Sequence, residues 1–571
     1  MRVGKRTGLK VCGALVVMAA IGVIAILPPA ALDTGGLTGE PAGAIVRGAY
    51  HIHSVRSDGS GTVESIAAAA ARAGLQFIIL TDHGDGTRPP DPPSYRSGVL
   101  TIDAVELNTT GGHYAALGLP ATPYPFAGMA EDVIEDVHRL GGFGLAAHPG
   151  SPRPSLAWQA WAAGFDGLEW INADSEWRDE ARWPLARTLL TYPVRAPESI
   201  AAVLDRPSGV LSKWDDAMQQ RRVITLAAAD AHARLAFRAG TDPDGSAIHV
   251  PLPGYESSFR AFSNHVVLDG PLTGTALIDA PHLLDAIRQG RVFTVIDGLA
   301  TPGGLEFSIS SGQDVARIGE QLSTEGPATL RARMAAPPGT TLVVIRNGTR
   351  FTTSQGDLEL SLAPGPAAYR LEAYLPSGRG TASVPWMVSN PIYVRRPAAS
   401  PLSIGHDAPQ SRIPARLTEA APELGRGDAS TVVLSDPQSG TRAGEPPAVW
   451  TFALSAGTAR GQFAALQIPI TGGLAPFDRV RFKVRSDRPM RVWTQLRATV
   501  GTTERWGRTF YTDEQERIVD LRLVDFQPIG ANAAAKPPLD KVDSLLFVVD
   551  TLNTLPGGKG AITISEVAFV R

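Results

Sequence analysis

The sequence predicts an α/β barrel followed by two β-sandwiches, and three observations support this order. Residues 43–295 alternate short apolar segments with helical ones, a pattern typical of parallel strands joined by crossover helices, most economically in a barrel. Residues 300–397 contain short strands of alternating polarity with turn signals and no convincing helix, as in an immunoglobulin-like sandwich. Residues 431–571 return to this texture, which favours a second, jelly-roll-like sandwich.

The first residues predict the compartment. Four basic residues precede an apolar run, Val11–Leu27, and such a flank keeps the N-terminus in the cytoplasm. A run of about 17 residues is at the lower limit for a spanning helix and above the usual signal-peptide core. We therefore expect residues 1–32 to be an uncleaved membrane anchor or a removed signal segment. In both cases the folded domains are expected outside the cytoplasm, in the periplasm or at the cell surface. They would be anchored in the cytoplasmic membrane, or secreted if the signal is cleaved.

The elements of the barrel follow from periodicity and from helix-end signals. A helix over Thr62–Ala73 would begin with Thr62 as N-cap and stop at Gly74. The apolar segment Gln76–Leu80 indicates a buried strand. The other expected strands are Ala44–Tyr50, Val99–Val105, Phe143–Ala147, Gly167–Ile171, Val223–Ala228 and Asn264–Leu268. The other expected helices are Met129–Leu140, Glu180–Thr191 and Lys213–Gln220.

The two sandwiches are predicted from alternating segments on either side of a linker. Strands of the first are expected at Glu306–Ser310, Ala328–Met334, Thr341–Arg346, Leu358–Leu362, Ala368–Leu375 and Ile392–Arg395. Asn347-Gly348 favours a hairpin turn. Residues 398–430 are rich in Pro, Ala, Gly and charge and are expected to be a linker. Strands of the second sandwich are expected at Ala448–Leu454, Gln462–Ile470, Arg479–Ser486, Met490–Val500, Ile518–Leu523, Ser544–Thr551 and Ala561–Val570.

Composition excludes several classes of site and partner. The only cysteine, Cys12, lies in the apolar N-terminal run, so a disulfide within the chain, a thiolate nucleophile and a zinc–thiolate site in the folded domains are all excluded. Any metal must therefore be held by imidazole nitrogen and carboxylate oxygen, which suits zinc, manganese or iron. The net charge of −3 and the lack of a basic stripe disfavour a nucleic-acid partner.

Side chains that can bind metals gather at the C-terminal ends of the expected barrel strands, where barrel active sites form. His51 and His53 end the first strand, and their spacing on an extended segment directs both imidazoles to one face. The full set comprises six histidines and three carboxylates: His51, His53, Asp58, His83, Glu106, His113, His148, Asp230 and His232.

One such residue alone would indicate little, because a histidine after a strand is usually a hydrogen-bonded structural residue and an aspartate there usually caps a helix. Nine such residues together indicate a metal site, because burying so many titratable groups side by side is costly unless cations compensate them. The sequence therefore predicts a cluster of about two to three divalent metal ions. The other histidines lack this context and are expected to be structural or exposed: His138, His249, His265, His282 and His406.

These motifs resemble the polymerase-and-histidinol-phosphatase (PHP) metallohydrolases over about 250 residues, between 43 and 295. The opening H-x-H-S-x-x-S-D-G, then T-D-H, G-G-H-Y-A-A-L-G, H-P and D-A-H are similar to the carbaryl-hydrolase-like branch. The resemblance implies a distorted (β/α)7 barrel with a trinuclear site. By position, it implies one ion held by His51, His53, Glu106 and Asp230. Glu106 would bridge to a second ion held by His113 and His148, and the third would be held by Asp58, His83 and His232.

Such a cluster is suited to ester hydrolysis. A water that bridges two ions about 3.5–4 Å apart loses a proton near neutral pH and becomes a nucleophile. Glu106 and Asp230 are the expected catalytic carboxylates. A guanidinium can hold substrate oxygens as charge builds on them. The arginines near ligands in the sequence are candidates: Arg234, which we favour, and Arg56, Arg88 and Arg238.

Two polar residues near the expected ligands have other predicted roles. Asn172, at the end of a strand, is expected either to line the pocket or to form a turn. Asp82, beside His83, is expected to orient a ligand or cap a helix rather than bind metal.

The sequence leaves three functions open. The first is an exported, membrane-tethered phosphoesterase that acts on a small-molecule or surface-polymer ester. The second keeps the metals but takes a carboxylic or carbamic ester, because an activated hydroxide attacks carbonyl and phosphorus centres alike. The third is a non-catalytic surface-binding protein with an idle barrel. Aromatic residues of the last sandwich are candidates for stacking on carbohydrate, or alternatively for its core: Trp493, Trp506, Phe510 and Tyr511.

Overall fold

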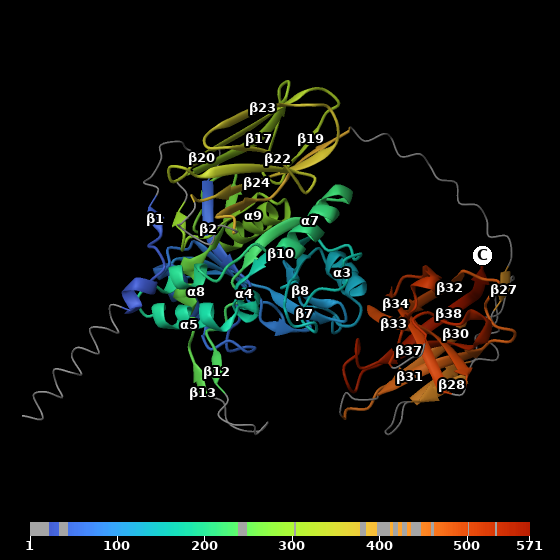
Figure 1. The fold of residues 1–571 in the computed structure, drawn as a ribbon. Helices are drawn as coiled ribbons and strands as arrows, with labels where there is room; N and C mark the ends of the chain where they lie inside the picture. The colour runs from blue at the N-terminus through green and yellow to red at the C-terminus, as the bar shows by residue number, and fades with distance from the viewer. Residues whose placement is uncertain are drawn as a thin grey trace, which may run out of the picture. The chain divides into compact units, whose positions relative to one another are not determined.

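The computed structural model divides the chain into two compact units (Figure 1). The first takes in Met1–Asp85, Pro89–Pro120 and Ile134–Ala399, and the second takes in Gly86–Arg88, Ala121–Val133 and Ser400–Arg571. The residues described are 22–33, 44–237, 248–301, 304–376, 384–396, 412–414, 421–424, 431–435, 447–457, 462–500, 502–530 and 534–571. Most of the expected membrane segment lies outside them, as do Arg238 and His406. Within these ranges no helix is long and apolar enough to cross a membrane.

Strand pairings in the first unit run in a ring. β2 (Ala44–Tyr50), β3 (Phe77–Leu80) and β6 (Val99–Asp103) lie parallel in one sheet. After β6 the chain continues into β7, which belongs to a second sheet. That sheet contains β7 (Val105–Thr109), β8 (Gly112–Leu117), β9 (Phe143–Ala146), β10 (Gly167–Asn172) and β11 (Ile224–Ala228). A bridge between Ile52 and Ala231 brings the residues after β11 back beside those after β2.

The ring is not uniformly parallel, in contrast to the pattern of crossover helices that the sequence predicts. β8, which the sequence does not predict as a strand, runs antiparallel to both β7 and β9. The chain reverses between β7 and β8 in a tight turn, where Gly112 has a φ of 117°, a conformation that favours glycine. β14 (Ser263–Leu268) is also antiparallel to β2.

The predicted helices are present with small shifts at their ends, except that the last of them begins at Ser208 rather than Lys213. In α2 (Val63–Arg72) the Thr62 side chain accepts the Ser65 N–H, as its expected N-cap role requires. The other predicted helices are α3 (Ala130–Arg139), α5 (Arg182–Thr191) and α7 (Ser208–Gln220). The helices that the sequence does not predict are α4 (Ala173–Asp179), α6 (Ala196–Ala201), α8 (Tyr255–Ala261) and α9 (Ala276–Arg288). The first three are short, and α9 contains Pro281, which normally interrupts a helix.

The expected domains 43–295 and 300–397 share one continuous sheet. β15 (Val292–Val295) pairs with β14 on one side and with β25 (Met387–Ser389) on the other. β25 in turn pairs with β24 (Ala367–Tyr374). Asn390 strengthens the junction, because its buried side chain accepts the Thr225 N–H and donates to the carbonyls of Thr225 and Val292. The first sandwich is therefore fused to the ring of strands.

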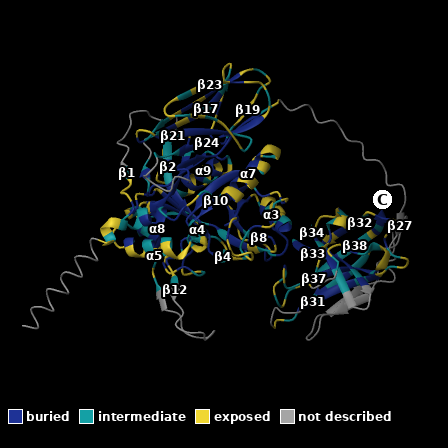
Figure 2. Ribbon diagram, viewed as in Figure 1, coloured by how far each residue is buried: buried dark blue, intermediate teal, exposed yellow. Residues whose placement is uncertain are grey.

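The first sandwich contains the strands that the sequence predicts. Its separate four-stranded sheet consists of β18 (Asp314–Arg317), β17 (Gly304–Ser311), β20 (Ala328–Ala335) and β23 (Leu358–Leu362). Asn347 and Gly348 form the predicted hairpin turn between β21 (Thr341–Arg346) and β22 (Thr349–Ser354), both with positive φ. Most strands of the first unit are buried (Figure 2), and the core of the ring includes Tyr50, Leu117 and Leu226.

The second unit contains a sandwich of two sheets. One consists of β29 (Thr431–Ser435), β30 (Ala448–Ala453), β38 (Lys559–Val570), β32 (Arg479–Ser486), β35 (Arg517–Arg522) and β27 (Arg412–Pro414). The other consists of β28 (Ala421–Leu424), β31 (Phe463–Pro469), β37 (Val542–Asp550), β33 (Met490–Val500), β34 (Thr502–Thr512) and β36 (Gln527–Pro528). The linker expectation for 398–430 needs correction here, because β27 and β28 pair with β38 and β31.

Two of the four aromatic residues considered for carbohydrate stacking belong to the core of this sandwich. Trp506 is fully buried and Phe510 nearly so, both inside a cluster that includes Phe482 and Phe547. Their position between the sheets excludes contact with a sugar. Trp493 and Tyr511 are half-buried, and Trp493 packs against a small apolar cluster separate from that core.

Replacing Asn390 by alanine is expected to destabilise the first unit by about 2 kcal/mol. The change leaves buried backbone groups of Thr225 and Val292 without partners. Calorimetry of the full chain should show a lower melting temperature for a transition that includes both the ring and the first sandwich. Gln313→Ala, in an exposed turn, should change stability by no more than about 0.5 kcal/mol. Separate melting of ring and sandwich in the parent chain would contradict this view of one fused unit.

Candidate metal centre

The structure brings together all nine side chains that the sequence singles out. His51, His53 and Asp58 follow β2, and His83 begins the short strand β4 (His83–Gly84) after β3. The remaining positions lie within or just after strands of the second sheet: Glu106 in β7, His113 in β8, His148 after β9, and Asp230 and His232 after β11. Their donor atoms form four overlapping groups, in each of which all atoms lie within 4.8 Å of one another.

Two histidine nitrogens lie at the spacing of metal ligands from each other and from two carboxylate oxygens. Nε2 of His51 and Nε2 of His53 lie 3.1 Å apart, and each lies 3.3 Å from Oε2 of Glu106. Oδ1 of Asp230 lies 3.5 Å from the His51 atom and 3.4 Å from the His53 atom. Bonds of about 2.0–2.1 Å to a tetrahedral ion separate its ligand atoms by roughly 3.3–3.4 Å. The two imidazoles therefore fit one divalent ion together with Glu106 or Asp230, each of which lies at about this spacing from both nitrogens.

Glu106 faces different histidines with its two oxygens, and His83 is a third histidine near Oε2, with its Nδ1 at 3.2 Å. Oε2 lies toward His51 and His53, whereas Oε1 lies 2.7 Å from Nδ1 of His113 and 2.9 Å from Nε2 of His148. The side chain is fully buried, so all its partners are within the protein. A carboxylate that presents its two oxygens to two donor sets is suited to bridge two ions.

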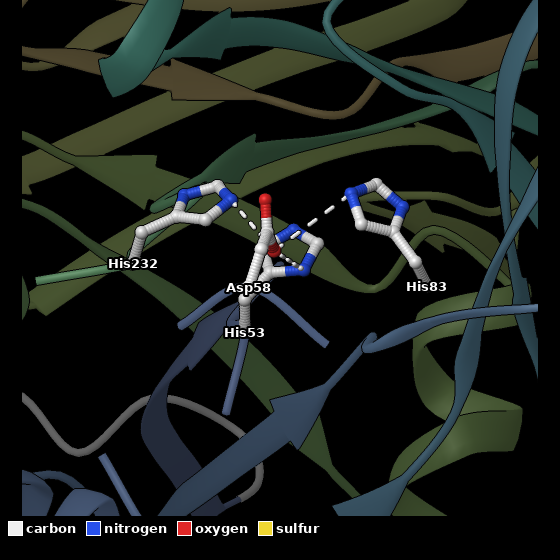
Figure 3. A group of neighbouring side chains, drawn as sticks. All are labelled: His53, Asp58, His83 and His232. Carbon is white, nitrogen blue, oxygen red and sulfur yellow. Dashed lines mark ion pairs between the residues drawn. The ribbon is translucent and has the colours of Figure 1, made fainter. Parts of the chain in front are cut away.

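A further group forms around Asp58 (Figure 3). Its Oδ1 lies 3.2 Å from Nε2 of His232, 3.4 Å from Nδ1 of His53 and 3.8 Å from Nε2 of His83. The other ring nitrogen of His83, Nδ1, lies 3.2 Å from Oε2 of Glu106. One carboxylate oxygen with three imidazole nitrogens around it fits a cation, and His83 connects this group to Glu106.

The backbone is strained at three of the nine positions. His51, His148 and Asp230 have φ values of 63°, 31° and 41°, which non-glycine residues seldom adopt. Hydrogen bonds between the two chain segments hold this geometry, because the His53 N–H donates to the Ala231 carbonyl and the Ala231 N–H to the His51 carbonyl. Strain of this kind persists only where surrounding contacts impose it, and it clusters at functional sites.

Glu169, inside β10, is a site residue that the sequence reasoning missed. Its Oε1 lies 2.5 Å from Nδ1 of His51, and its Oε2 accepts the His148 backbone N–H at 2.6 Å. A carboxylate on Nδ1 fixes the ring so that Nε2 points at the metal position. The available signal was a charged residue within the otherwise apolar segment Gly167–Ile171.

Asp82 and Tyr255 hold the loops that carry the ligands. Asp82 accepts the Ser54 N–H at 2.7 Å and hydroxyls of Ser54 and Ser57, so it fixes the loop between His53 and Asp58. This arrangement fits the orienting role expected for Asp82. Tyr255 donates its hydroxyl hydrogen to the His53 carbonyl at 2.8 Å, and nothing in its sequence context indicated that contact.

Carboxylates and histidines share charge within the cluster. Burial by itself would raise the pKa of Glu106, but the charge of His51 and the hydrogen bond from His113 hold it well below its usual value. Burial would lower the pKa of His232, but its hydrogen bond with Asp58 raises it to about 9. These shifts favour protonated histidines beside charged carboxylates. Because metal ligands must be deprotonated, divalent ions would take the place of those protons.

The candidate arginines occupy different environments. Arg234 is exposed and donates to the backbone carbonyl of Asp58 at 3.3 Å, which places it beside the Asp58 group. Arg56 pairs with Asp91 and Asp103. Arg178 on α4, which the sequence analysis did not single out, pairs with Asp174. Burial would lower the pKa of Arg178, but Asp174 and the charge of Asp230 raise it. Arg178 is therefore a second guanidinium near the cluster.

Asn172 lines a cavity beside the cluster, which is one of the two roles expected for it, and it caps a helix rather than forming a turn. Its side-chain oxygen accepts the Ser175 N–H at the start of α4, and its amide donates to Glu169 at 2.9 Å. Histidines outside the cluster behave as expected where they are described. His138 contacts Asp166, His265 is buried against Phe293, and His282 is exposed on α9.

A cavity of about 360 Å³ lies beside the cluster. Glu169, which contacts His51 and His148 of the cluster, lines this cavity, and the cavity wall also includes Gly150, Trp161 and Glu176. Burial raises the pKa of Glu176 to about 8, and the side chain accepts the Asp205 N–H at 2.9 Å. An aromatic ring with a few polar groups in a cavity of this size is typical of a small-molecule pocket.

Comparisons with known proteins give only distant similarities. No family model and no curated protein match the chain. A two-domain protein from Bacteroides vulgatus, described as containing a predicted PHP-like metal-dependent phosphoesterase, is 13% identical; the match covers 64% of this chain and 98% of that one, with a TM-score of 0.27. The family 11 carbohydrate-binding module of a Clostridium thermocellum cellulase is 11% identical over 27% of this chain and 87% of its own, with a TM-score of 0.22. Scores this low establish no shared function.

Full-length protein purified in detergent is expected to contain about two to three equivalents of zinc, manganese or iron, because nine nitrogen and oxygen donors converge. Elemental analysis measures this content. His53→Ala should remove at least about one equivalent, since its two ring nitrogens face different donor groups. His282→Gln, an exposed change on α9, should leave the content unchanged. Less than about one equivalent in the parent protein after metal addition would contradict the predicted cluster.

Proposed function

We propose that the first unit is a metal-dependent hydrolase of the PHP type that cleaves phosphate esters. The observation that supports this most is the ligand-like spacing of the His51 and His53 nitrogens from each other and from the carboxylate oxygens of Glu106 and Asp230. The second oxygen of Glu106, directed at two more histidines, supports an adjacent ion. The motifs that resemble the carbaryl-hydrolase-like branch fall on these same residues.

Divalent cations at these positions would supply Lewis acidity and lower the pKa of a bound water to about 7. The protein's own side chains hold the ligand residues in place and orient them. Glu169 fixes His51, Asp82 fixes the loop to Asp58, and the closed surroundings of Glu106 exclude bulk water from one side. Arg234 and Arg178 are the guanidinium groups that we propose to contact substrate oxygens, and such contacts strengthen as negative charge develops.

The cavity beside Glu169 is proposed to take the organic part of the substrate. Carboxylic or carbamic esters are the alternative substrates, because their carbonyl carbon is open to the same attack. A panel of p-nitrophenyl phosphate, bis-p-nitrophenyl phosphate and 1-naphthyl acetate, each with manganese or zinc, separates the two. A protein with full metal content that cleaves none of them would favour the non-catalytic alternative.

Glu106→Gln is expected to lower kcat by at least about 10², the scale of losing one strong electrostatic stabiliser. Glutamine keeps the size and hydrogen-bonding capacity of the side chain but removes the charge between two donor sets. The measurement is steady-state hydrolysis of the best substrate of the panel at saturating metal. Circular dichroism and melting should confirm that the variant is folded.

The matched control for Glu106→Gln is His282→Gln, which should keep activity within about threefold. It also replaces a titratable side chain by glutamine, but at an exposed position outside the cluster. Equal activity of folded Glu106→Gln and parent enzyme would show that Glu106 has no bridging role.

We also propose that the hydrolase acts outside the cytoplasm and is attached to the membrane through the run Val11–Leu27. The four basic residues before the run favour this orientation. A reporter enzyme that is active only outside the cytoplasm, fused after Arg571, is therefore expected to be active. A matched fusion of a reporter enzyme that works only in the cytoplasm should show no activity. The opposite pair of results would place the metal centre inside the cell.

Contact between the second unit and carbohydrate stays a prediction. With Trp506 and Phe510 in the core, it depends on the half-buried Trp493 and Tyr511. Both lie on the central strands β33 and β34, where side chains at alternate positions face away from the core.

A further inference from the structure

An apolar stripe follows α5 and the turn after it, on the first unit. Trp183, Leu190 and Val194 expose 65%, 52% and 60% of their surface. Spacings of seven and four residues put side chains on one face of a helix, and the Arg195 N–H donates to the Thr191 carbonyl, so the helical course continues past α5. Most large apolar side chains of this unit are buried. Three exposed ones on one helix face therefore need an explanation.

The end of the apolar N-terminal run is fastened beside this stripe. Nε of Arg187 donates to the Ile26 carbonyl at 2.8 Å, and Nη1 of Arg195 donates to the Pro28 carbonyl at 2.6 Å. Arg187 lies four residues after Trp183, on the same side of the helix. A little further along, β1 (Leu32–Asp33) pairs with β16 (Ala300–Thr301). The chain that leaves the apolar run is thus bound to the body of the first unit.

This attachment brings the stripe close to any membrane that holds the run Val11–Leu27. Ile24, within that run, is itself 67% exposed. It precedes the bound Ile26 by only two residues, about 3 Å along a helix. A bilayer around the run would therefore begin within about one helical turn of the stripe.

The side chains around the stripe suit the interface of a bilayer. Tryptophan is enriched at the level of lipid headgroups, and leucine and valine favour the acyl chains just below. Arg182, Arg187 and Arg195 lie along the same stretch, and guanidinium groups bind phosphate. Glu180 and Glu198 are the acidic residues nearest in sequence, so the stretch has a net positive charge.

We propose that the Trp183 face, defined as Ile24, Trp183, Leu190 and Val194, docks onto the phospholipid bilayer that holds the N-terminal run. The inference rests on the membrane attachment proposed above and adds that the first unit lies against the membrane in one orientation. A second copy of the chain is a poorer occupant, because four side chains fall well short of the ~800 Å² per partner of a standard interface.

Spin labels placed on the full chain test this docking. The sequence has a single cysteine, so Cys12→Ser removes the native thiol and Leu190→Cys adds one label site in the Trp183 face. Leu277→Cys, on α9, is the matched control, because Leu277 is a leucine at the start of a helix with 69% of its surface exposed. Each protein is reconstituted into vesicles of phosphatidylethanolamine and phosphatidylglycerol. Collisions of the label with oxygen, which partitions into lipid, are compared with collisions with a water-soluble nickel chelate.

The label at Leu190 is expected to show an oxygen-to-nickel collision ratio at least about fivefold above that at Leu277, since the acyl region concentrates oxygen and excludes the chelate. Equal ratios on protein that floats with the vesicles would overturn the docking and leave the attachment standing. Protein that fails to float would overturn the attachment and the docking with it.

Spin–spin broadening at Leu190 would assign the face to a second copy, and a label shielded from both reagents would assign it to the chain's own N-terminal residues. Either result overturns docking on lipid.

Discussion

The complete burial of Glu106 is the constraint on which the rest of the first unit depends. A carboxylate without access to water is costly unless charges or donors compensate it, and here five histidines from four segments of the chain surround it. Those histidines can reach it only if the strands that carry them end at one edge of the ring. The strand order, the close approach of Ile52 to Ala231 and the short pairing of His83 with Glu106 all follow from that requirement.

Holding the ligands in place has a conformational cost that neighbouring contacts offset. Non-glycine residues with positive φ cost on the order of 1–3 kcal/mol each, and His51, His148 and Asp230 are of this kind. Glu169 contacts two of them, through the ring of His51 and the backbone of His148. These supports lie on β10, deep in the sheet, where side chains have little freedom. The fused first sandwich adds rigidity from outside, because Asn390 fixes β11 against β15.

The sequence was most informative where chemistry and local pattern coincide. Most of the nine cluster residues could be found because they follow an apolar segment or lie at its end, and histidines two apart on a strand must share a face. Glu169 was missed because it lies within such a segment and no local rule separates a charged residue facing a site from one facing solvent. β8 was missed because its small residues resemble a loop. Local periodicity does not predict contacts between residues that are far apart in the sequence. The fusion of ring and sandwich and the pairing of β27 with β38 depend on such contacts.

The crossover between β10 and β11 links three parts of the first unit. At its start, Asn172 caps α4 and donates to Glu169, which joins the crossover to the metal cluster. Two residues separate α4 from α5, where Arg187 holds the end of the apolar run. Before α7, Arg206 donates to Glu372 of β24 at 2.6 Å and fixes the crossover to the sandwich. A segment bound at three points moves as one piece, so the distance from the Trp183 face to the cluster is set by the fold. A chain held by its apolar run alone would present the cluster in any orientation, whereas one held by the run and this face presents it in one.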